Sequence, residues 1–386
     1  MECDPMATSN SPDTDRRAAG LRKDGKRTMQ RARLRGIGKM RKLDLTAFTQ
    51  RLAAMLDAGL PLVQCMDALS DQTATPEFKA VVRDIGLRIE GGDSFAEALE
   101  RYHELFGDLY VSMIRSGEMG GGLAEVTGRL AVYLEKSQKM VRKVKSAMTY
   151  PVMVLGMALI LTTAMILFIV PVFKRIFDDF GAKLPAPTQF LITVSDTIKH
   201  QSLIIIVVLG GIIYALRKYL ATDQGTMVFH RYVLKAPLAG PIIEKVAIAR
   251  MSRTWASMLR SGVPILKCIE IGSTATGNRF LGSLLKNAGA KVENGQPLSR
   301  AIQESGVGFR FPPMLIHMVS AGEKTGNVDG MLEKVADFYE DEVEKSLESL
   351  ASMIEPLLMG FLGVTVGGIV ICMFLPIFKM HEIVNN

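Results

Sequence analysis

The chain has 386 residues, 48% of them apolar, and a mean hydropathy of +0.21, which fits an integral membrane protein with sizeable aqueous parts. The net charge of +7 arises entirely from residues 1–42, which hold twelve Lys or Arg against five Asp or Glu. The remaining chain is neutral, so the basic composition gives no argument for nucleic-acid binding, and no nucleic acid is expected as a partner.

Residues 1–43 are predicted to form a basic, disordered tail, because they combine many cations with few apolar residues. Such a tail can contact anionic lipid headgroups on the cytoplasmic leaflet, where each cation contributes about 1 kcal/mol. The alternative is a solvated leader with no partner. The arginines are not followed by an apolar core, so the segment lacks the pattern of a signal peptide.

The rest of the sequence is an internal repeat. The stretch that opens at Leu45 recurs at Ile248 with an offset of 203 residues, which becomes 205 after a short insertion. The matched pairs include Gly59 and Gly262, Pro61 and Pro264, Cys65 and Cys268, Pro151 and Pro356. Each copy is a polar, helix-patterned region that leads into a long apolar segment, which indicates a duplicated module attached to a membrane.

The apolar residues of both copies recur at i, i+3, i+4 and i+7, which predicts helical bundles. The expected fold class is therefore an all-α integral membrane protein with two repeated cytoplasmic helical-bundle domains and three transmembrane helices. The predicted segments are the tail 1–43, domain 1 at 44–146, a first span at 147–173, an external loop at 174–201, a second span at 202–220, domain 2 at 221–355, a third span at 356–378, and an external tail at 379–386.

The second predicted span is shorter than the others, and a re-entrant or buried-core helix is the alternative for it. Lys and Arg gather before the first span and after the second, so the positive-inside rule places both domains in the cytoplasm. The apolar cores of the three spans contain no Asp, Glu, Lys or Arg. This argues against an ion pathway through them.

Two short turns carry the most distinctive motif, Gly117-Glu118-Met119-Gly120-Gly121 and Gly322-Glu323-Lys324-Thr325-Gly326. The structural interpretation is that the glycines end one helix and that the carboxylate lies near the N-terminus of the following helix. The functional hypothesis is that the turns contact a partner, through Gly117, Glu118, Gly121, Gly322, Glu323 and Gly326. On that hypothesis, alanine in place of either glutamate leaves folding intact and weakens assembly. Lys324 follows a glutamate and a helix, so a phosphate-binding loop is excluded.

Within the third span, Gly363 and Gly367 form a GxxxG pair, which predicts close helix packing. The acidic run from Glu340 to Glu348 is predicted to be a solvated helix face, with a docking site for a basic partner as the alternative. The four cysteines have no CxxC spacing, so we predict neither a metal site nor a redox pair, and we expect Cys65 and Cys268 to be buried. No catalytic residue and no cofactor is predicted.

From about residue 44 to its end, the chain resembles the inner-membrane platform proteins of type IV filament machines, which serve type II secretion and type IV pilus assembly. The resemblance rests on the repeated Gly-Leu/Val-Pro after the first helix, the paired Gly-Glu-x-x-Gly turns, Tyr150-Pro151, Leu184-Pro185 with Thr188, the stretch from Glu355-Pro356 to Gly363, and Leu375-Pro376-Ile377-Phe378. The tail 1–43 departs from the family, since many relatives have a more ordered leader.

The resemblance implies a non-enzymatic protein of the bacterial inner membrane that forms homo-oligomers beneath a growing pilus or pseudopilus. It would couple a cytoplasmic hexameric ATPase to the extraction and assembly of pilins or pseudopilins, together with other inner-membrane assembly proteins and membrane lipid. The choice between protein secretion and pilus biogenesis stays open. The alternatives are a two-repeat membrane transporter, a membrane-anchored sensor, and a membrane-anchored scaffold unrelated to filaments. Transporter repeats usually place their sites on polar or broken helices at the membrane midplane, and these spans lack charge.

Overall fold

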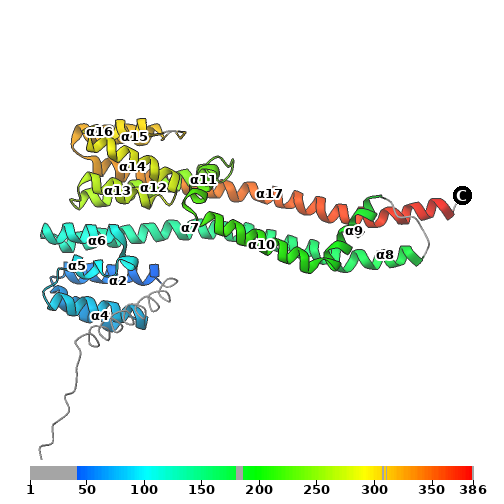
Figure 1. Cartoon of the computed structure of the whole chain (residues 1–386), viewed down its shortest axis with the longest axis horizontal. Coiled ribbons are helices and arrows are strands. Elements are labelled where there is room, and N and C mark those ends of the chain that lie inside the picture. The colour runs from blue at the N-terminus through cyan, green and yellow to red at the C-terminus, as the bar shows by residue number, and fades with distance from the viewer. Residues whose placement is uncertain (1–40, 180–185, 307, 310, 385–386) are drawn as a thin grey trace, which may run out of the picture. The chain divides into compact units, whose positions relative to one another are not determined.

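The computed structural model describes residues 41–179, 186–306, 308–309 and 311–384. Every regular element within these ranges is a helix, and one of them is a short π-helix (Figure 1). The all-α prediction is therefore confirmed for the described residues. The predicted basic tail, 1–43, lies outside them except for its last three positions, which begin the first described helix.

The contacts divide the chain into two compact units. The first comprises Met1–Lys136 with Arg260–Val263, and the second comprises Ser137–Leu259 with Pro264–Asn386. The helices of the first bundle, followed by the helix that leads out of it, are α2 (Arg41–Asp57), α3 (Leu62–Gln72), α4 (Pro76–Glu90), α5 (Phe95–Glu100), α6 (His103–Met119) and α7 (Leu123–Ala164).

The chain then passes through η2 (Met165–Ile169), α8 (Val170–Asp179), α9 (Ala186–His200), α10 (Ser202–Leu220) and α11 (Asp223–Val233). The second bundle and the helix that leads out of it are α12 (Gly240–Arg260), α13 (Ile265–Ala275), α14 (Arg279–Glu293), α15 (Leu298–Ser305), α16 (Pro313–Thr325) and α17 (Val328–Val384). The segment predicted as an external loop, 174–201, is thus largely helical, because it contains the end of α8 and all of α9.

The sequence repeat is also a repeat of helices. Helices α3, α4 and α5 each begin 203 residues before α13, α14 and α15, and α7 begins 205 residues before α17. The turn glycines match as well, since Gly59 and Gly262 have φ angles of 80° and 77°. Only glycine adopts this left-handed conformation without strain, so the repeated glycine reflects a repeated turn.

A buried apolar core fills each bundle. In α2, Leu45, Phe48 and Leu52 follow the helical spacing and are all buried, and Phe48 packs edge-on against Phe78 with ring centroids 5.6 Å apart. Figure 1 shows α2 beside the other helices of this bundle. The predicted burial of the repeat-equivalent cysteines is confirmed, because both are fully buried. Burial raises the pKa of the Cys268 thiol to about 12, which leaves it protonated and inert.

One core position differs between the two copies in a compensated way. Trp255 in the second bundle replaces Leu52, and both side chains are fully buried. Gly272 replaces Leu69, and a Cβ at Gly272 would lie only 1.9 Å from Nε1 of Trp255. The small residue therefore makes room for the large one in a close-packed core.

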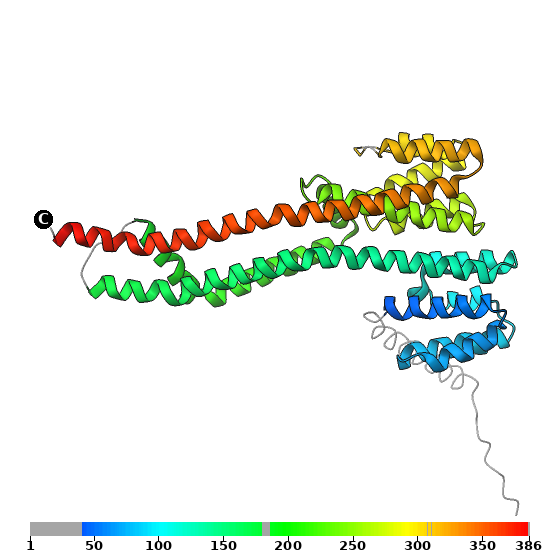
Figure 2. The same ribbon diagram turned by 180° about the vertical axis from the view of Figure 1, so that it is seen from behind.

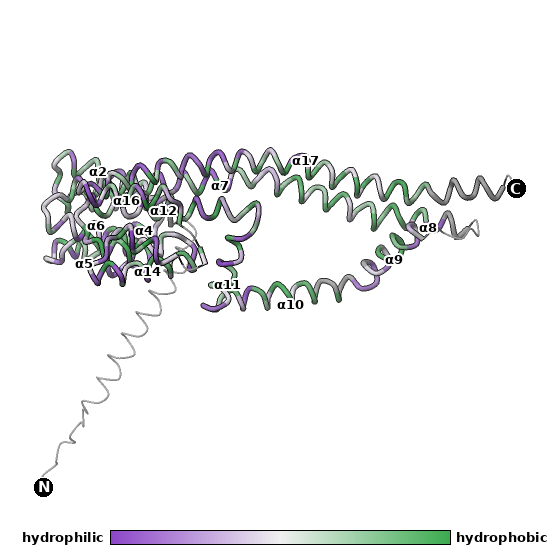
Figure 3. The backbone as a smooth tube through the Cα atoms, turned by 90° about the horizontal axis from the view of Figure 1, so that it is seen from above, coloured by the Kyte–Doolittle hydropathy of each residue, from purple (hydrophilic) through white to green (hydrophobic). Residues whose placement is uncertain are grey.

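Two helices run without a break from polar into apolar sequence. Pro151 lies inside the 42-residue α7, and α17 spans 57 residues (Figure 2). Among the described residues, two helical stretches are long and apolar enough to cross a membrane, Leu123–Arg175 and Val328–Phe374. Helix α10 coincides with the predicted second span, and its backbone is coloured mainly as hydrophobic (Figure 3). Most of its large apolar side chains that the structure describes are exposed.

The glycine pair of the third predicted span makes no close contact with the part of this chain that the structure describes. A Cβ at Gly363 or Gly367 would meet no atom within 4 Å, apart from the helix's own backbone. Close packing at this pair therefore stays a prediction that concerns another copy or another protein.

Gly272→Ala is expected to lower the free energy of unfolding by about 1–3 kcal/mol, because the added methyl overpacks the core against Trp255. The double change Trp255→Leu with Gly272→Leu copies the first bundle and is expected to recover much of that loss. Denaturant unfolding of the full chain in detergent measures both. Gly128→Ala is the control, since its Cβ would lie in open space. Equal stability of the two Gly→Ala variants would contradict the prediction.

Candidate functional site

The two Gly-Glu turns connect equivalent helices in the two bundles. In the first copy, α6 ends at Met119, and Gly121 has a φ of 70°. In the second copy, α16 ends at Thr325, and Gly326 has a φ of 71°. The predicted role of glycine in ending these helices is therefore confirmed at both turns, since both positions require the left-handed conformation.

The Glu118 carboxylate caps a helix from a distance. Its two oxygens accept hydrogen bonds from the backbone amides of Phe95 and Ala96, at 2.6 and 2.9 Å. These amides belong to the first turn of α5, where an α-helix has no internal acceptors for its N–H groups. The prediction that the glutamate lies near the N-terminus of the following helix was wrong, because the capped helix begins 23 residues upstream.

Glu323 makes the equivalent interaction in the second bundle. Its carboxylate accepts hydrogen bonds from the backbone amides of Leu298 and Ser299 in the first turn of α15, the latter at 3.2 Å. The Ser299 hydroxyl also donates to it, at 2.5 Å. The capped positions correspond between the repeats, so the motif stabilises the same helix in both bundles.

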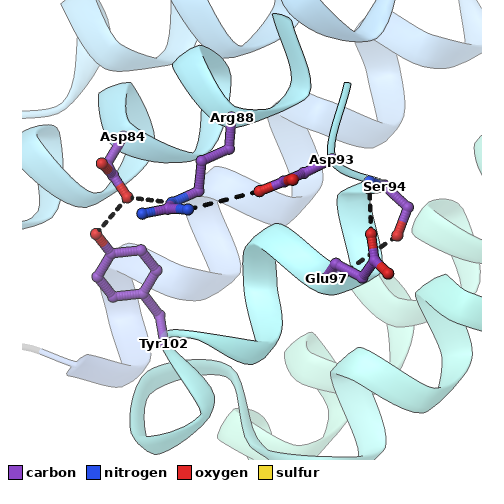
Figure 4. A network of polar contacts seen from close by, with 6 residues as sticks. All are labelled: Asp84, Arg88, Asp93, Ser94, Glu97 and Tyr102. Atoms are coloured by element: carbon purple, nitrogen blue, oxygen red, sulfur yellow. Dashed lines mark hydrogen bonds and ion pairs between the residues drawn. The ribbon is translucent and has the colours of Figure 1, made fainter. Parts of the chain in front are cut away.

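The two capped helices differ in their local support. The hydroxyl of Ser94 caps α5 by accepting a hydrogen bond from the amide of Glu97, at 3.2 Å, and the Glu97 carboxylate accepts one from the amide of Ser94, at 3.1 Å (Figure 4). At the N-cap of α15 stands Pro297, which makes no side-chain capping bond. Helix α15 therefore depends on Glu323 more than α5 depends on Glu118.

Charged side chains hold the loop that leads into α5. Arg88 contacts Asp84 at 2.7 Å and Asp93 at 3.5 Å, and the Tyr102 hydroxyl donates to Asp84 at 2.8 Å (Figure 4). Burial raises the pKa of Asp84, but the hydrogen bonds from Arg88 and Tyr102 outweigh this effect and hold the pKa below its ordinary value. The loop is thereby fixed, and the N-terminus of α5 is presented to the glutamate.

In the second bundle, a carboxylate rather than a guanidinium is the central group that stabilises the equivalent loop. Gln296, Arg300 and Lys291 all donate to the carboxylate of Glu304, at 2.9, 2.8 and 3.3 Å. These hydrogen bonds, that of Gln296 foremost, lower the pKa of Glu304 to about 2. The loop geometry is thus conserved between the copies although the charges that stabilise it are not.

The first glycine of each motif permits close packing. A Cβ at Gly117 would lie 3.0 Å from the side chain of Val126, and a Cβ at Gly322 would lie 2.8 Å from the backbone of Val328. In each case the neighbour belongs to the long helix that follows the turn. These glycines therefore let α6 and α16 approach α7 and α17.

The turns nevertheless present an exposed surface. Met119 has 86% of its surface exposed, and the residues from Lys324 to Gly326 are exposed too. The two glutamates are only partly exposed, and the carboxylates of both accept hydrogen bonds from backbone amides. These hydrogen bonds give the glutamates a structural role as caps of α5 and α15, while the partner-contact hypothesis for the turns stays a prediction.

The acidic run of α17 pairs with cations inside the chain. Glu340 accepts a hydrogen bond from the buried Arg253 at 2.9 Å, Glu342 accepts one from Lys245 at 2.9 Å, and Glu344 pairs with Lys143 at 2.6 Å. Arg253 also reaches Asp337, at 2.5 Å. These contacts tie α17 to α12 and to α7, so much of this face is already used within the chain.

An open pocket of about 1150 Å³ is lined by α15, by the first part of α16 and by residues of the segment between them. Its lining combines aromatic and charged side chains, including Phe309, Phe311, Arg300, Glu304 and His317. Among the described residues, no group of three or more His, Cys, Asp or Glu is placed to hold a metal ion.

The sequence model of a known family matches this chain in two segments. The family, described as type II secretion system (T2SS) protein F, matches residues 48–171 and 251–376. The matched segments start 203 positions apart and end 205 positions apart, which reproduces the offsets of the internal repeat.

Relatives of the chain are named for pilus assembly and for secretion. The type IV pilus assembly protein PilC of Myxococcus xanthus is 40% identical over 349 residues, which cover 89% of this chain and 82% of the relative. PilC of Thermus thermophilus is 42% identical over 87% of this chain and 82% of the relative. The type II secretion system protein F of Pseudomonas aeruginosa is 31% identical over 89% of this chain and 84% of the relative.

Glu323→Gln is expected to lower the free energy of unfolding by about 1–2 kcal/mol, the usual effect of a lost helix cap. Glu118→Gln is expected to cost less, because Ser94 and Glu97 continue to cap α5. Thermal unfolding of the full chain in detergent compares the two variants, with the exposed Met119→Ala as the control. Unchanged stability of Glu323→Gln together with weakened filament assembly would contradict the capping role and favour a partner contact.

Proposed function

Since this chain belongs to the family of type II secretion system protein F, we propose that it is the inner-membrane platform on which a type IV filament is assembled. The observation that carries the proposal is the match of the family to both copies of the repeat, over the bundles and the apolar segments alike. The platform role requires no chemical step from this chain, and we assign it no catalytic residue.

Between the two kinds of machine, we propose pilus assembly. The relatives at 40% and 42% identity are named for the type IV pilus, whereas the type II secretion system protein F of Pseudomonas aeruginosa is 31% identical. A pilus relative at 30% identity also occurs, so the preference rests on the two relatives at 40% and 42% identity.

The proposed topology has three spans, with both bundles in the cytoplasm. The apolar parts of α7 and α17 supply two spans, and α10 supplies the third. Support for α10 comes from its length of 19 residues, its lack of charge before Arg217, and the exposure of the apolar side chains Ile204, Val207, Val208, Leu209, Ile212 and Ile213. Water solvates such a surface poorly, whereas lipid covers it at no cost. An odd number of spans places the C-terminus on the far side of the membrane.

The platform needs partners to do its work. The sequence contains no phosphate-binding loop at its turns, so the energy for extracting pilins from the membrane comes from a separate cytoplasmic ATPase, which we propose to be hexameric. Pilins, other inner-membrane assembly proteins and further copies of this chain complete the proposed assembly. The continuous helices α7 and α17 join each bundle to the membrane and are suited to carry a conformational change between them.

Deletion of the gene is expected to abolish surface pili and to leave the extracellular release of periplasmic proteins intact. Electron microscopy of the cell surface and assay of culture supernatants measure the two phenotypes in parallel, and a plasmid-borne copy of the gene is the control. Loss of secretion with pili intact would assign the chain to type II secretion instead. If neither phenotype changed in a strain without a paralogue, the platform role would be contradicted.

A further inference from the structure

Each repeat ends its apolar segment with a proline at an equivalent position, Pro171 in the first copy and Pro376 in the second. Proline has no amide hydrogen, so a proline inside a helix leaves a carbonyl of the preceding turn without its usual donor. In an apolar environment such a carbonyl costs free energy unless a nearby group donates to it. Both copies of the repeat therefore create the same problem at the same place.

The first copy meets this problem with a π-turn. The amide of Val170 donates to the carbonyl of Met165, five residues earlier, as in a π-helix. The carbonyl of Ile166 would take its donor from Val170 in an α-helix and from Pro171 in a π-helix. Val170 is already engaged and Pro171 has no amide hydrogen, so neither serves Ile166.

Helix α9 supplies the missing donor. The hydroxyl of Ser195, which is only 1% exposed, donates to the carbonyl of Ile166 at 2.8 Å. An ion pair of 2.8 Å between Lys174 and Asp196 lies next to this contact in sequence, on α8 and α9. Helix α9 is therefore held against the π-turn by both a buried hydroxyl and a charge pair.

The second copy has the equivalent defect, and the same helix serves it. In the α-helical α17, the carbonyl of Cys372 would take its donor from Pro376, four residues later, which has none. The hydroxyl of Thr188, which is 3% exposed, donates to this carbonyl. The carbonyl belongs to the fifth residue before the proline in the first copy and to the fourth residue before it in the second. These are the hydrogen-bond spacings of a π-turn and of an α-turn.

The two hydroxyls lie on one face of α9. Thr188 and Ser195 are seven residues apart, which corresponds to two turns of helix. Between them, the buried Ile192 packs in a small apolar cluster with Val170 of α8 and with Ile369 and Met373 of α17. Figures 1 and 2 both show α9 between the ends of α8 and α17. One helix thus contacts both repeats through equivalent defects.

We infer that α9 is a hydrogen-bonding bracket that joins the outer ends of the two repeat helices by donating hydroxyl protons to the carbonyls that Pro171 and Pro376 leave without a donor. Thr188 and Ser195 are its positioning residues. The bracket assigns a specific role to a segment whose sequence suggested only a connecting loop. It concerns the fold of the chain itself, so it holds whichever filament the protein serves.

The test is a pair of double-mutant cycles on the purified full chain in detergent, with the midpoint of thermal unfolding as the readout. Ser195→Ala is expected to lower the midpoint by several degrees. Pro171→Ala restores an amide donor next to Ile166 and is expected to reverse most of that loss when combined with Ser195→Ala. Thr188→Val and Pro376→Ala are expected to behave as the same kind of pair.

Two sets of controls distinguish donor loss from general damage. Thr193→Val and Thr197→Val remove exposed hydroxyls that bond only within α9, to the carbonyls of Gln189 and Thr193, and are expected to leave the midpoint nearly unchanged. The crossed combinations, Ser195→Ala with Pro376→Ala and Thr188→Val with Pro171→Ala, are expected to show no rescue.

Additive effects in both matched pairs would overturn the bracket, as would equal rescue in matched and crossed pairs. If Ser195→Ala fails to accumulate in the membrane, accumulation of the Ser195→Ala, Pro171→Ala double variant becomes the readout. Restored accumulation supports the inference, and continued absence of the double variant beside a normally accumulating Pro171→Ala variant contradicts it.

Discussion

A buried backbone group without a hydrogen-bond partner costs about 1–3 kcal/mol, and much of this structure depends on meeting that constraint. At the start of α5 and α15, backbone amides that have no acceptor within their helix donate hydrogen bonds to the carboxylates of Glu118 and Glu323. At the ends of the apolar helices, carbonyls that have no donor within their helix accept hydrogen bonds from the hydroxyls of Ser195 and Thr188. In all four places the partner comes from a distant part of the sequence, so each contact that satisfies the backbone also fixes the tertiary fold.

The duplication kept these contacts and changed their surroundings. Gln50 donates to Glu135 at 3.1 Å in the first copy, whereas at the equivalent position the buried Arg253 pairs with Glu340 and Asp337. Removing one partner of a buried ion pair is strongly destabilising. Loss of this contact is therefore expected to destabilise the second copy more than loss of the Gln50–Glu135 hydrogen bond destabilises the first. The core shows a similar change, because Trp255 and Gly272 stand where the first copy has two leucines.

The sequence pattern was sufficient to predict the helical bundles, their duplication, the glycines that end α6 and α16, and the buried cysteines, because these follow from local periodicity and from turn chemistry. It was not sufficient for contacts between distant residues. Nothing near Glu118 in sequence indicates that its carboxylate accepts a hydrogen bond from the amide of Phe95. The sequence around Ser195 likewise does not indicate that its hydroxyl donates to the carbonyl of Ile166. The segment 174–201 was predicted as a loop because it connects two apolar segments, although the buried face of α9 recurs at helical spacing. The hypothesis that the turns contact a partner concerns surfaces of other proteins, which the sequence of this chain does not describe.

The unbroken length of α17 has a mechanical consequence. With 57 residues, the helix is about 85 Å long at roughly 1.5 Å per residue, and on the proposed topology a bilayer core of about 30 Å covers only part of it. The remainder is a lever arm of roughly 55 Å, along which a tilt of about 5° moves the far end by roughly 5 Å. That displacement matches the rise of one helical turn. On the proposed topology, a displacement of about 5 Å at the end of the arm that lies in the bundle therefore tilts the helix by only about 5° where it enters the membrane.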